Sequence, residues 1–155
     1  MRFTFAFLLF LITLTVALPA AKEKSSSTKT KLVKGIESNL KHGDKEIKAT
    51  KQAQDEAAKG NDKQVKKKEG KINDALDAAI KDRKGNQKLA GNKDPALTKG
   101  LGKVENAQKG AKKTVGGLTG DSKKDKAALG QLGATFEKGK KTNTENLKEA
   151  KKNFH

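Results

Sequence analysis

From residue 32 onward, apolar positions recur at the three- and four-residue spacing of amphipathic helices. Nothing alternates between apolar and polar over a useful length, and β-branched residues are sparse, so strands are poorly supported. The pattern predicts helices over residues 32–59, 63–84, 95–116 and 122–154. We therefore expect a single all-α region over 32–155, either loosely packed helical hairpins or a four-helix bundle, with part of the chain disordered.

The third segment has the clearest stripe, because seven positions on one side of the helix, apolar except for one glutamine, follow one another at spacings of four and three. These positions are Leu97, Leu101, Val104, Gln108, Ala111, Val115 and Leu118. Asp94 can cap this helix, and Pro95 suits its first turn. The other stripes are Leu32, Ile36, Leu40 and Ile47; Val65, Ile72, Leu76 and Ile80; and Leu129, Leu132, Phe136, Leu147, Ala150 and Phe154.

Between the last two helices lies KKTVGGLTGDSKK, residues 112–124. A phosphate-binding loop needs Gly, four residues, then Gly-Lys-Ser/Thr, and no register of this stretch fits that spacing. A helix hinge explains it better, with Gly116, Gly117, Gly120 and Asp121 as the hinge residues. We expect Gly116 and Gly117 to supply a left-handed turn that ends one helix, and Asp121 or Ser122 to cap the next.

The first residues have the pattern of a cleaved secretory signal peptide, over 1–21. Arg2 gives a positive start, 3–16 is an apolar run, and small residues follow. A membrane span needs about 20 apolar residues, and this run is shorter. The protein is therefore expected to be secreted and extracellular, at the cell wall or in a host cell. Residues 22–31, KEKSSSTKTK, have nothing to pack and predict a flexible linker.

The remaining chain can bury only a thin core. Large apolar residues make up about 20 of the residues from Lys22 onward, and the chain has no cysteine for disulfides. Several glycines also fall inside the predicted helices, where each costs about 1 kcal/mol relative to alanine. They are Gly100, Gly102, Gly110, Gly130, Gly133 and Gly139. A bundle of marginal helices and a chain that folds on a surface or partner both remain open, and close helix approach is a second role for the glycines.

The charge is strongly positive, with a formal net charge of +17 from 35 basic and 18 acidic residues. Almost all of it is lysine, a hydrated point charge that favours salt-sensitive attraction to polyanions over selective base recognition. Clusters of adjacent lysines are the candidate polyanion-binding residues: Lys66, Lys67, Lys68, Lys112, Lys113, Lys123, Lys124, Lys140, Lys141, Lys151 and Lys152. The expected partner is an anionic polymer or surface bound non-specifically (cell-wall polysaccharide, anionic lipid or nucleic acid) or a host protein, and not a small-molecule substrate.

No constellation of residues suggests catalysis. His42 and His155 have no arrangement of ligands typical of zinc. No serine lies in a nucleophile elbow, and paired carboxylates such as Asp74 and Asp77 lie among lysines that suit ion pairing. We therefore expect no enzyme activity, no cofactor and no metal.

Residues 108–141, QKGAKKTVGGLTGDSKKDKAALGQLGATFEKGKK, resemble the CsbD-like stress proteins of bacteria and fungi. Residues 117–121 would be the family's turn, with Gly130, Gly133 and Gly139 as its later glycines, although Leu129 stands where an acidic residue is usual. Residues 48–60 resemble the repeats of late-embryogenesis-abundant proteins. Both resemblances imply a hydrophilic, stress-associated protein without catalysis, while the whole chain is similar in style to small secreted fungal proteins.

Two functions follow from these observations. The first is a secreted, non-enzymatic protein that acts by charge and amphipathic helix surface, as a host-directed effector or a cell-wall-associated protein. The alternative is a stress hydrophilin that protects surfaces or membranes during drying.

Overall fold

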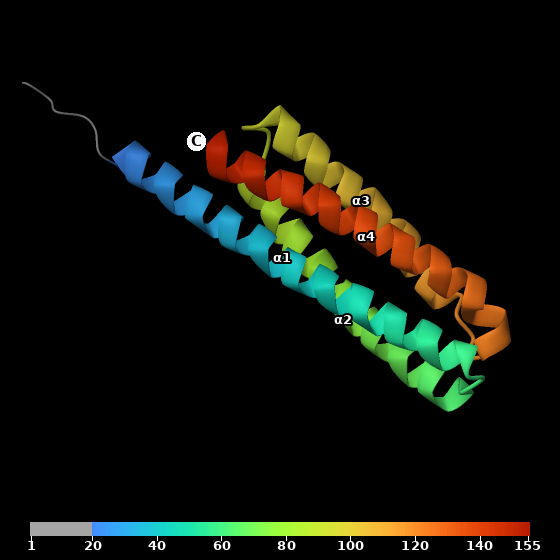
Figure 1. Ribbon diagram of the computed structural model, residues 1–155. Helices are drawn as coiled ribbons and strands as arrows, with labels where there is room; N and C mark the ends of the chain where they lie inside the picture. The colour runs from blue at the N-terminus through green and yellow to red at the C-terminus, as the bar shows by residue number, and fades with distance from the viewer. Residues whose placement is uncertain (1–19) are drawn as a thin grey trace, which may run out of the picture.

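The computed structural model describes residues 20–155, with side chains from residue 26 onward. These residues form four helices and no strand: α1 (Ala20–Ala58), α2 (Asp62–Ala90), α3 (Pro95–Gly116) and α4 (Ser122–Lys152). The helices run up and down as an elongated bundle, joined by short turns (Figure 1). α1 packs against α2 and α4, and α3 packs against the same two helices, so α1 lies diagonal to α3. The predicted all-α four-helix bundle is confirmed.

Residues 22–31, predicted to be a flexible linker, are instead helical and belong to α1, which begins at Ala20. Within this polar stretch the Thr30 hydroxyl donates to the carbonyl of Ser26, 2.9 Å away. Leu32 and Ile36, both fully buried, anchor the turns that follow, and helix extension from an anchored turn needs no new nucleus. The predicted signal peptide lies almost entirely in residues 1–19, outside the described part of the chain.

Side-chain caps begin the later helices. Asn61 accepts a hydrogen bond from the Gln64 amide, and Asp94 accepts one from Leu97 at 3.0 Å. Asp121 caps α4 by accepting from the amides of Lys123 and Lys124, each at 3.0 Å. The predicted caps at Asp94 and Asp121 therefore form as expected.

The hinge between α3 and α4 differs from the prediction in one respect. Gly117 keeps right-handed helical geometry, with φ −93° and ψ −4°, and Gly116 is the last residue of α3. The left-handed position is Gly120, with φ +82°. Buried Asp125 explains this shift, because its carboxylate accepts from the amides of Thr119 and Gly120, 2.9 and 2.7 Å away, and folds the turn back over the start of α4.

Two apolar clusters fill the two ends of the bundle. The cluster beside the α1–α2 and α3–α4 turns includes Ile72, Leu76, Leu129, Leu132 and Phe136, together with small residues. The cluster at the opposite end is formed by Leu32, Ile36, Ala90, Leu97, Leu101, Ala150 and Phe154. We call these the turn-end cluster and the terminal cluster.

Between the two clusters the interior is mainly polar, with Ala79 and Val104 as its buried apolar residues. Asn39, Glu46, Arg83, Gln108 and Asn143 are each 3–7% exposed, and they form the layer that we call the polar middle. The predicted stripe of the first helix is therefore partly wrong, because Asn39 and Glu46 face the interior while Leu40 and Ile47 are only half-buried. The second helix also continues beyond its predicted end at 84, since Asn86 and Ala90 are buried too.

Two interior asparagines lie directly over glycines of a neighbouring helix. A Cβ added to Gly35 would lie 2.0 Å from Oδ1 of Asn86, and one added to Gly100 would lie 1.8 Å from Oδ1 of Asn146. The close-approach role expected of the helix glycines therefore holds at Gly100, and Gly35, which was not among the glycines predicted for it, has the same role. At Gly102, Gly110, Gly130 and Gly139 nothing lies within 4 Å of such an atom, so these glycines leave open space.

Candidate polyanion interface

A groove of about 490 Å³ runs along the outer seam between α1 and α2. Its lining residues are His42, Lys45, Lys48, Ala49, Gln52, Lys68, Lys71, Asp74, Ala75 and Ala78. Each helix contributes two lysines three residues apart, a spacing that places both on one side of a helix. Alanines between these rows leave the seam open. We call this surface the α1–α2 groove.

The charges of the α1–α2 groove are mostly uncompensated. Lys45, Lys48 and Lys71 are exposed, and none forms an ion pair with a described residue. Lys68 donates to Oε1 of Gln52, 2.9 Å away, which ties the two helices together while leaving its charge unneutralised. Asp74 is the one acidic lining residue. At one end, Nε2 of His42 lies 3.6 Å from the Asp82 carboxylate.

Only Lys68, of the lysines predicted from adjacent clusters, lines this groove. Four others form ion pairs: Lys112 with Asp77 at 2.6 Å, Lys124 with Asp121 at 3.4 Å, Lys140 with Asp44 at 2.7 Å, and Lys151 with Glu37 at 2.8 Å. Three of these pairs join different helices. The hydrogen bond to Asp44 raises the pKa of Lys140, and the one from Lys151 lowers the pKa of Glu37. These four lysines are partly neutralised by neighbours.

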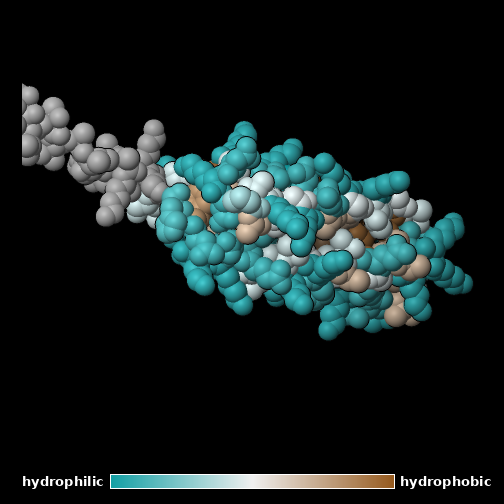
Figure 2. Space-filling view, turned by 90° about the horizontal axis from the view of Figure 1, so that it is seen from above, coloured by the Kyte–Doolittle hydropathy of each residue, from teal (hydrophilic) through white to brown (hydrophobic). Residues whose placement is uncertain are grey.

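The other predicted lysines are exposed, and the structure does not bring them together. They are Lys66, Lys67, Lys113, Lys123, Lys141 and Lys152, none with an ion pair to a described residue. Adjacent helical residues point about 100° apart, so a run of lysines spreads around its helix. Lys66 lies with its aliphatic carbons against Gly120 at the hinge. In the face shown in Figure 2, hydrophilic residues dominate and apolar residues appear only in small separate patches.

Lys45, Lys48 and Lys71 were not predicted from the sequence, because none of them is adjacent to another lysine along the chain. They come together only through the packing of α1 against α2. The signal was present in another form, as lysines spaced by three on each of two adjacent helices. Recognising it requires knowing that α1 and α2 pair along this seam.

The hinge residues have a structural role, which is to connect α3 to α4. Gly116, Gly117, Gly120 and Asp121 connect α3 to α4, and Oδ1 of Asp62 accepts from the Ser122 amide at 2.9 Å. Hydrogen bonding from the side chain of Ser122, and next from its backbone amide, lowers the pKa of Asp62. The contact fastens the start of α4 to the start of α2. The stretch 112–124 thus forms the elbow of a helical hairpin.

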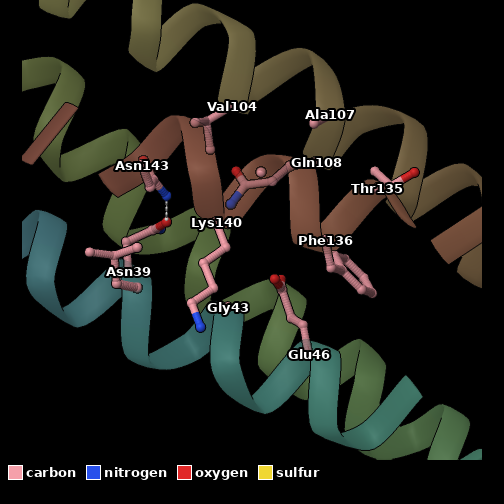
Figure 3. A pocket seen from close by; sticks show the side chains of 12 residues that line it. Asn39, Gly43, Glu46, Val104, Ala107, Gln108, Thr135, Phe136, Lys140 and Asn143 are labelled. Carbon is pink, nitrogen blue, oxygen red and sulfur yellow. Dashed lines mark hydrogen bonds between the residues drawn. The ribbon is translucent and has the colours of Figure 1, made fainter. Parts of the chain in front are cut away.

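A small cavity of about 20 Å³ opens into the polar middle beside Glu46. Figure 3 shows the Glu46 carboxyl pointing from α1 toward α3 and α4, with Gln108 and Phe136 across the space. Oε1 of Glu46 is buried without a hydrogen-bond partner, and burial raises the pKa of Glu46 to about 8. A cavity of this volume has room for about one water molecule.

A second buried acid, Glu69, lies near the hinge. Burial and the adjacent Asp125 carboxylate raise the pKa of Glu69 to about 7, since two neighbouring carboxylates resist holding two negative charges. Among residues 20–155 no group of three His, Asp or Glu side chains is arranged to hold a metal ion. No helix within the same residues is long and apolar enough to cross a membrane.

Comparisons with known proteins return nothing: no family model, no curated protein and no solved structure matches this chain. The class of the protein is therefore given by its own structure, a lysine-rich four-helix bundle with a cationic groove between its first two helices.

Proposed function

We propose that this protein is a non-enzymatic, secreted binder of acidic polysaccharide, and that the α1–α2 groove receives the polymer. One observation carries the proposal: four lysines from two helices face a single open seam whose floor is alanine. Paired rows of ammonium groups suit a linear chain of carboxylates or sulfates lying between them.

The composition of the surface favours a polysaccharide over nucleic acid. Base recognition uses arginine forks, and single strands use aromatic stacking platforms. Arg83, the one arginine among the described residues, is 4% exposed and donates to Gln108 at 2.8 Å. The chain has no tyrosine or tryptophan, and the described phenylalanines Phe136 and Phe154 are buried. Neither kind of nucleic-acid contact is available at the groove.

A membrane surface fits less well for a geometric reason. Membrane-bound helices place basic residues beside apolar side chains that insert among lipids. The floor of the α1–α2 groove is instead recessed and made of Ala49, Ala75 and Ala78. Such a seam suits a narrow polymer better than a flat sheet of headgroups.

The binding is expected to be strongly salt-dependent, because three of the four groove lysines are exposed and screening acts over about 8–10 Å at 0.1–0.15 M salt. In this proposal the protein acts at the producing cell's wall or on acidic polymers of a host. Its lysine surface attracts the acidic polymer electrostatically and catalyses no reaction.

The test measures binding of fluorescent oligogalacturonate to the purified protein in low salt by anisotropy. Lys48→Gln with Lys71→Gln removes two groove charges and should weaken binding about tenfold or more. The matched control, Lys84→Gln with Lys88→Gln, removes two exposed α2 lysines that do not line the groove and should weaken binding much less. Absence of binding by the wild type at low salt would refute the proposal, as would equal losses in both double variants.

The hydrophilin alternative has one observation in its favour. Exposed helical glycines such as Gly110 and Gly130, with open space where a side chain would lie, weaken their helices when isolated. Circular dichroism separates the two proposals. A hydrophilin should be largely unordered in buffer and gain helix on drying, whereas a groove-forming bundle should be helical in buffer and melt cooperatively.

A further inference from the structure

A second basic groove lies along the seam between α3 and α4, with a volume of about 580 Å³. It is lined by Lys103, Asn106, Ala107, Thr135, Lys138, Gly139 and Thr142. Ala107 and Gly139 leave the floor open, as alanines do in the first groove, and no acidic side chain lines this surface. We call it the α3–α4 groove.

The lining of the α3–α4 groove offers both charge and hydrogen bonds. Lys103 and Lys138 are exposed and form no ion pair with any residue in the described range 20–155. Asn106 is exposed, and neither its amide nor its carbonyl group bonds another described side chain. The amide can therefore donate to a carboxylate or sulfate oxygen.

The two threonines add acceptors that suit sugar hydroxyls. The Thr135 hydroxyl donates to the carbonyl of Gln131 at 2.8 Å, and that of Thr142 donates to the carbonyl of Lys138 at 3.1 Å. With its proton committed to the helix, each oxygen keeps lone pairs that can accept a hydrogen bond from a ligand. A ligand with anionic groups and hydroxyls along one chain matches this combination.

The two grooves lie on opposite sides of the bundle. α1 contacts α2 and α4, while α3 contacts α2 and α4, so the α1–α2 seam and the α3–α4 seam are opposite sides of the four-helix arrangement (Figure 1). A single rigid stretch of polymer cannot lie in both grooves along the bundle at once. Two chains, or two distant parts of one chain, can.

We propose that the α3–α4 groove is a second acidic-polysaccharide site and that the protein is a cross-linker, holding one polymer chain on each face. The proposal rests on the proposed function of the α1–α2 groove and adds the second site and its consequence. A protein with one groove would coat polymer chains, while one with two opposed grooves joins them into a network.

The first experiment counts sites with oligogalacturonate too short to span the bundle. Isothermal titration should give two oligomers per wild-type molecule, and one per molecule for either groove variant, Lys48→Gln with Lys71→Gln or Lys103→Gln with Lys138→Gln. No binding at all would refute the proposed function itself. One oligomer per wild-type molecule would overturn only the second site.

The second experiment measures light scattering with long polygalacturonate. As wild-type protein is added to a fixed amount of polymer, scattering should first rise and then fall. It falls because, in excess, each protein molecule binds a single polymer chain and no longer joins two. Both groove variants should lose most of the scattering while still binding the short oligomer. The control Lys84→Gln with Lys88→Gln has the same net charge as the groove variants and should scatter like the wild type. If that control loses scattering equally, general charge neutralisation explains the network and the cross-linking proposal is wrong.

Discussion

The two ends of the bundle and its middle are built on opposite principles. The turn-end cluster buries large side chains such as Ile72, Leu76 and Phe136 against one another. The polar middle buries Asn39, Glu46 and their neighbours at similar exposure, though such groups lose hydration without gaining apolar contact. Burial at the ends supplies most of the folding free energy, while the middle restricts how the helices can align.

Hydrogen bonds in the middle show how that restriction arises. Nδ2 of Asn143 on α4 donates to Oδ1 of Asn39 on α1, and Nδ2 of Asn39 donates to the carbonyl of Ala79 on α2. Arg83 on α2 donates to Gln108 on α3. A slip of one turn between any of these helices would leave buried polar groups unpaired, at a cost of about 1–3 kcal/mol each. The polar layer therefore gives this thin apolar core a single helix alignment.

The largest expected effect comes from breaking an end. Leu76→Ala removes a fully buried side chain from the turn-end cluster and should lower the free energy of unfolding by about 2–5 kcal/mol. Ile80→Ala, one turn further along α2 at a half-buried position, should cost clearly less. Urea denaturation at a fixed pH measures both. Similar losses would mean that the end is not packed as described.

The polar middle should respond to pH through Glu46. In the folded protein the pKa of Glu46 is about 8, against about 4.5 when unfolded, so the folded state holds its proton more tightly. The contribution of Glu46 to stability is therefore fully present below about pH 4.5, falls as pH rises toward 8, and levels off above that. The total loss from this group is on the order of 5 kcal/mol at most. Glu69, with a pKa of about 7, adds to the same trend.

Glu46→Gln tests this pH dependence because the amide resembles the protonated acid in size. The variant should match the wild type near pH 4 and be more stable by a few kcal/mol near pH 9, in urea titrations at several pH values. Glu137→Gln, at an exposed position of α4, should leave the profile unchanged. A Glu46→Gln profile parallel to that of the wild type would show that Glu46 is not buried as a neutral acid.

The smallest effect separates two glycines of α3. Gly102→Ala should stabilise the bundle by up to about 1 kcal/mol, since nothing lies within 4 Å of the new methyl group. Gly100→Ala should destabilise it, because the methyl group would displace the buried Asn146 side chain. Thermal melts of both variants measure the difference. Equal shifts of the same sign would contradict the close packing of α3 on α4.

Much of the fold could be predicted from the sequence. The stripe from Leu97 to Val115 is buried as expected, and Asp94 and Asp121 cap their helices, because caps and periodicity are local signals. The helical state of residues 22–31 could not be predicted in this way, since a polar stretch shows no stripe and becomes helical through the helix that follows it.

The polar middle and the groove could not be predicted from local signals. A periodicity search favours Leu40 and Ile47 over Asn39 and Glu46, because it assumes that interior positions are apolar. The burial of Asn39 depends on partners that lie 40 and 104 residues away in the sequence, Ala79 and Asn143. Likewise, Lys48 and Lys71 become neighbours only through helix pairing.

The terminal cluster has a consequence for the order in which the protein can form. It combines Leu32 and Ile36 from the beginning of the bundle with Ala150 and Phe154, and Phe154 is 1% exposed. During synthesis the turn-end cluster has all its residues once Phe136 has been made. The terminal cluster is complete only when Phe154 has left the ribosome. Until then Leu32 and Ile36 lack part of their final set of partners, and the terminal end of the nascent bundle remains incomplete.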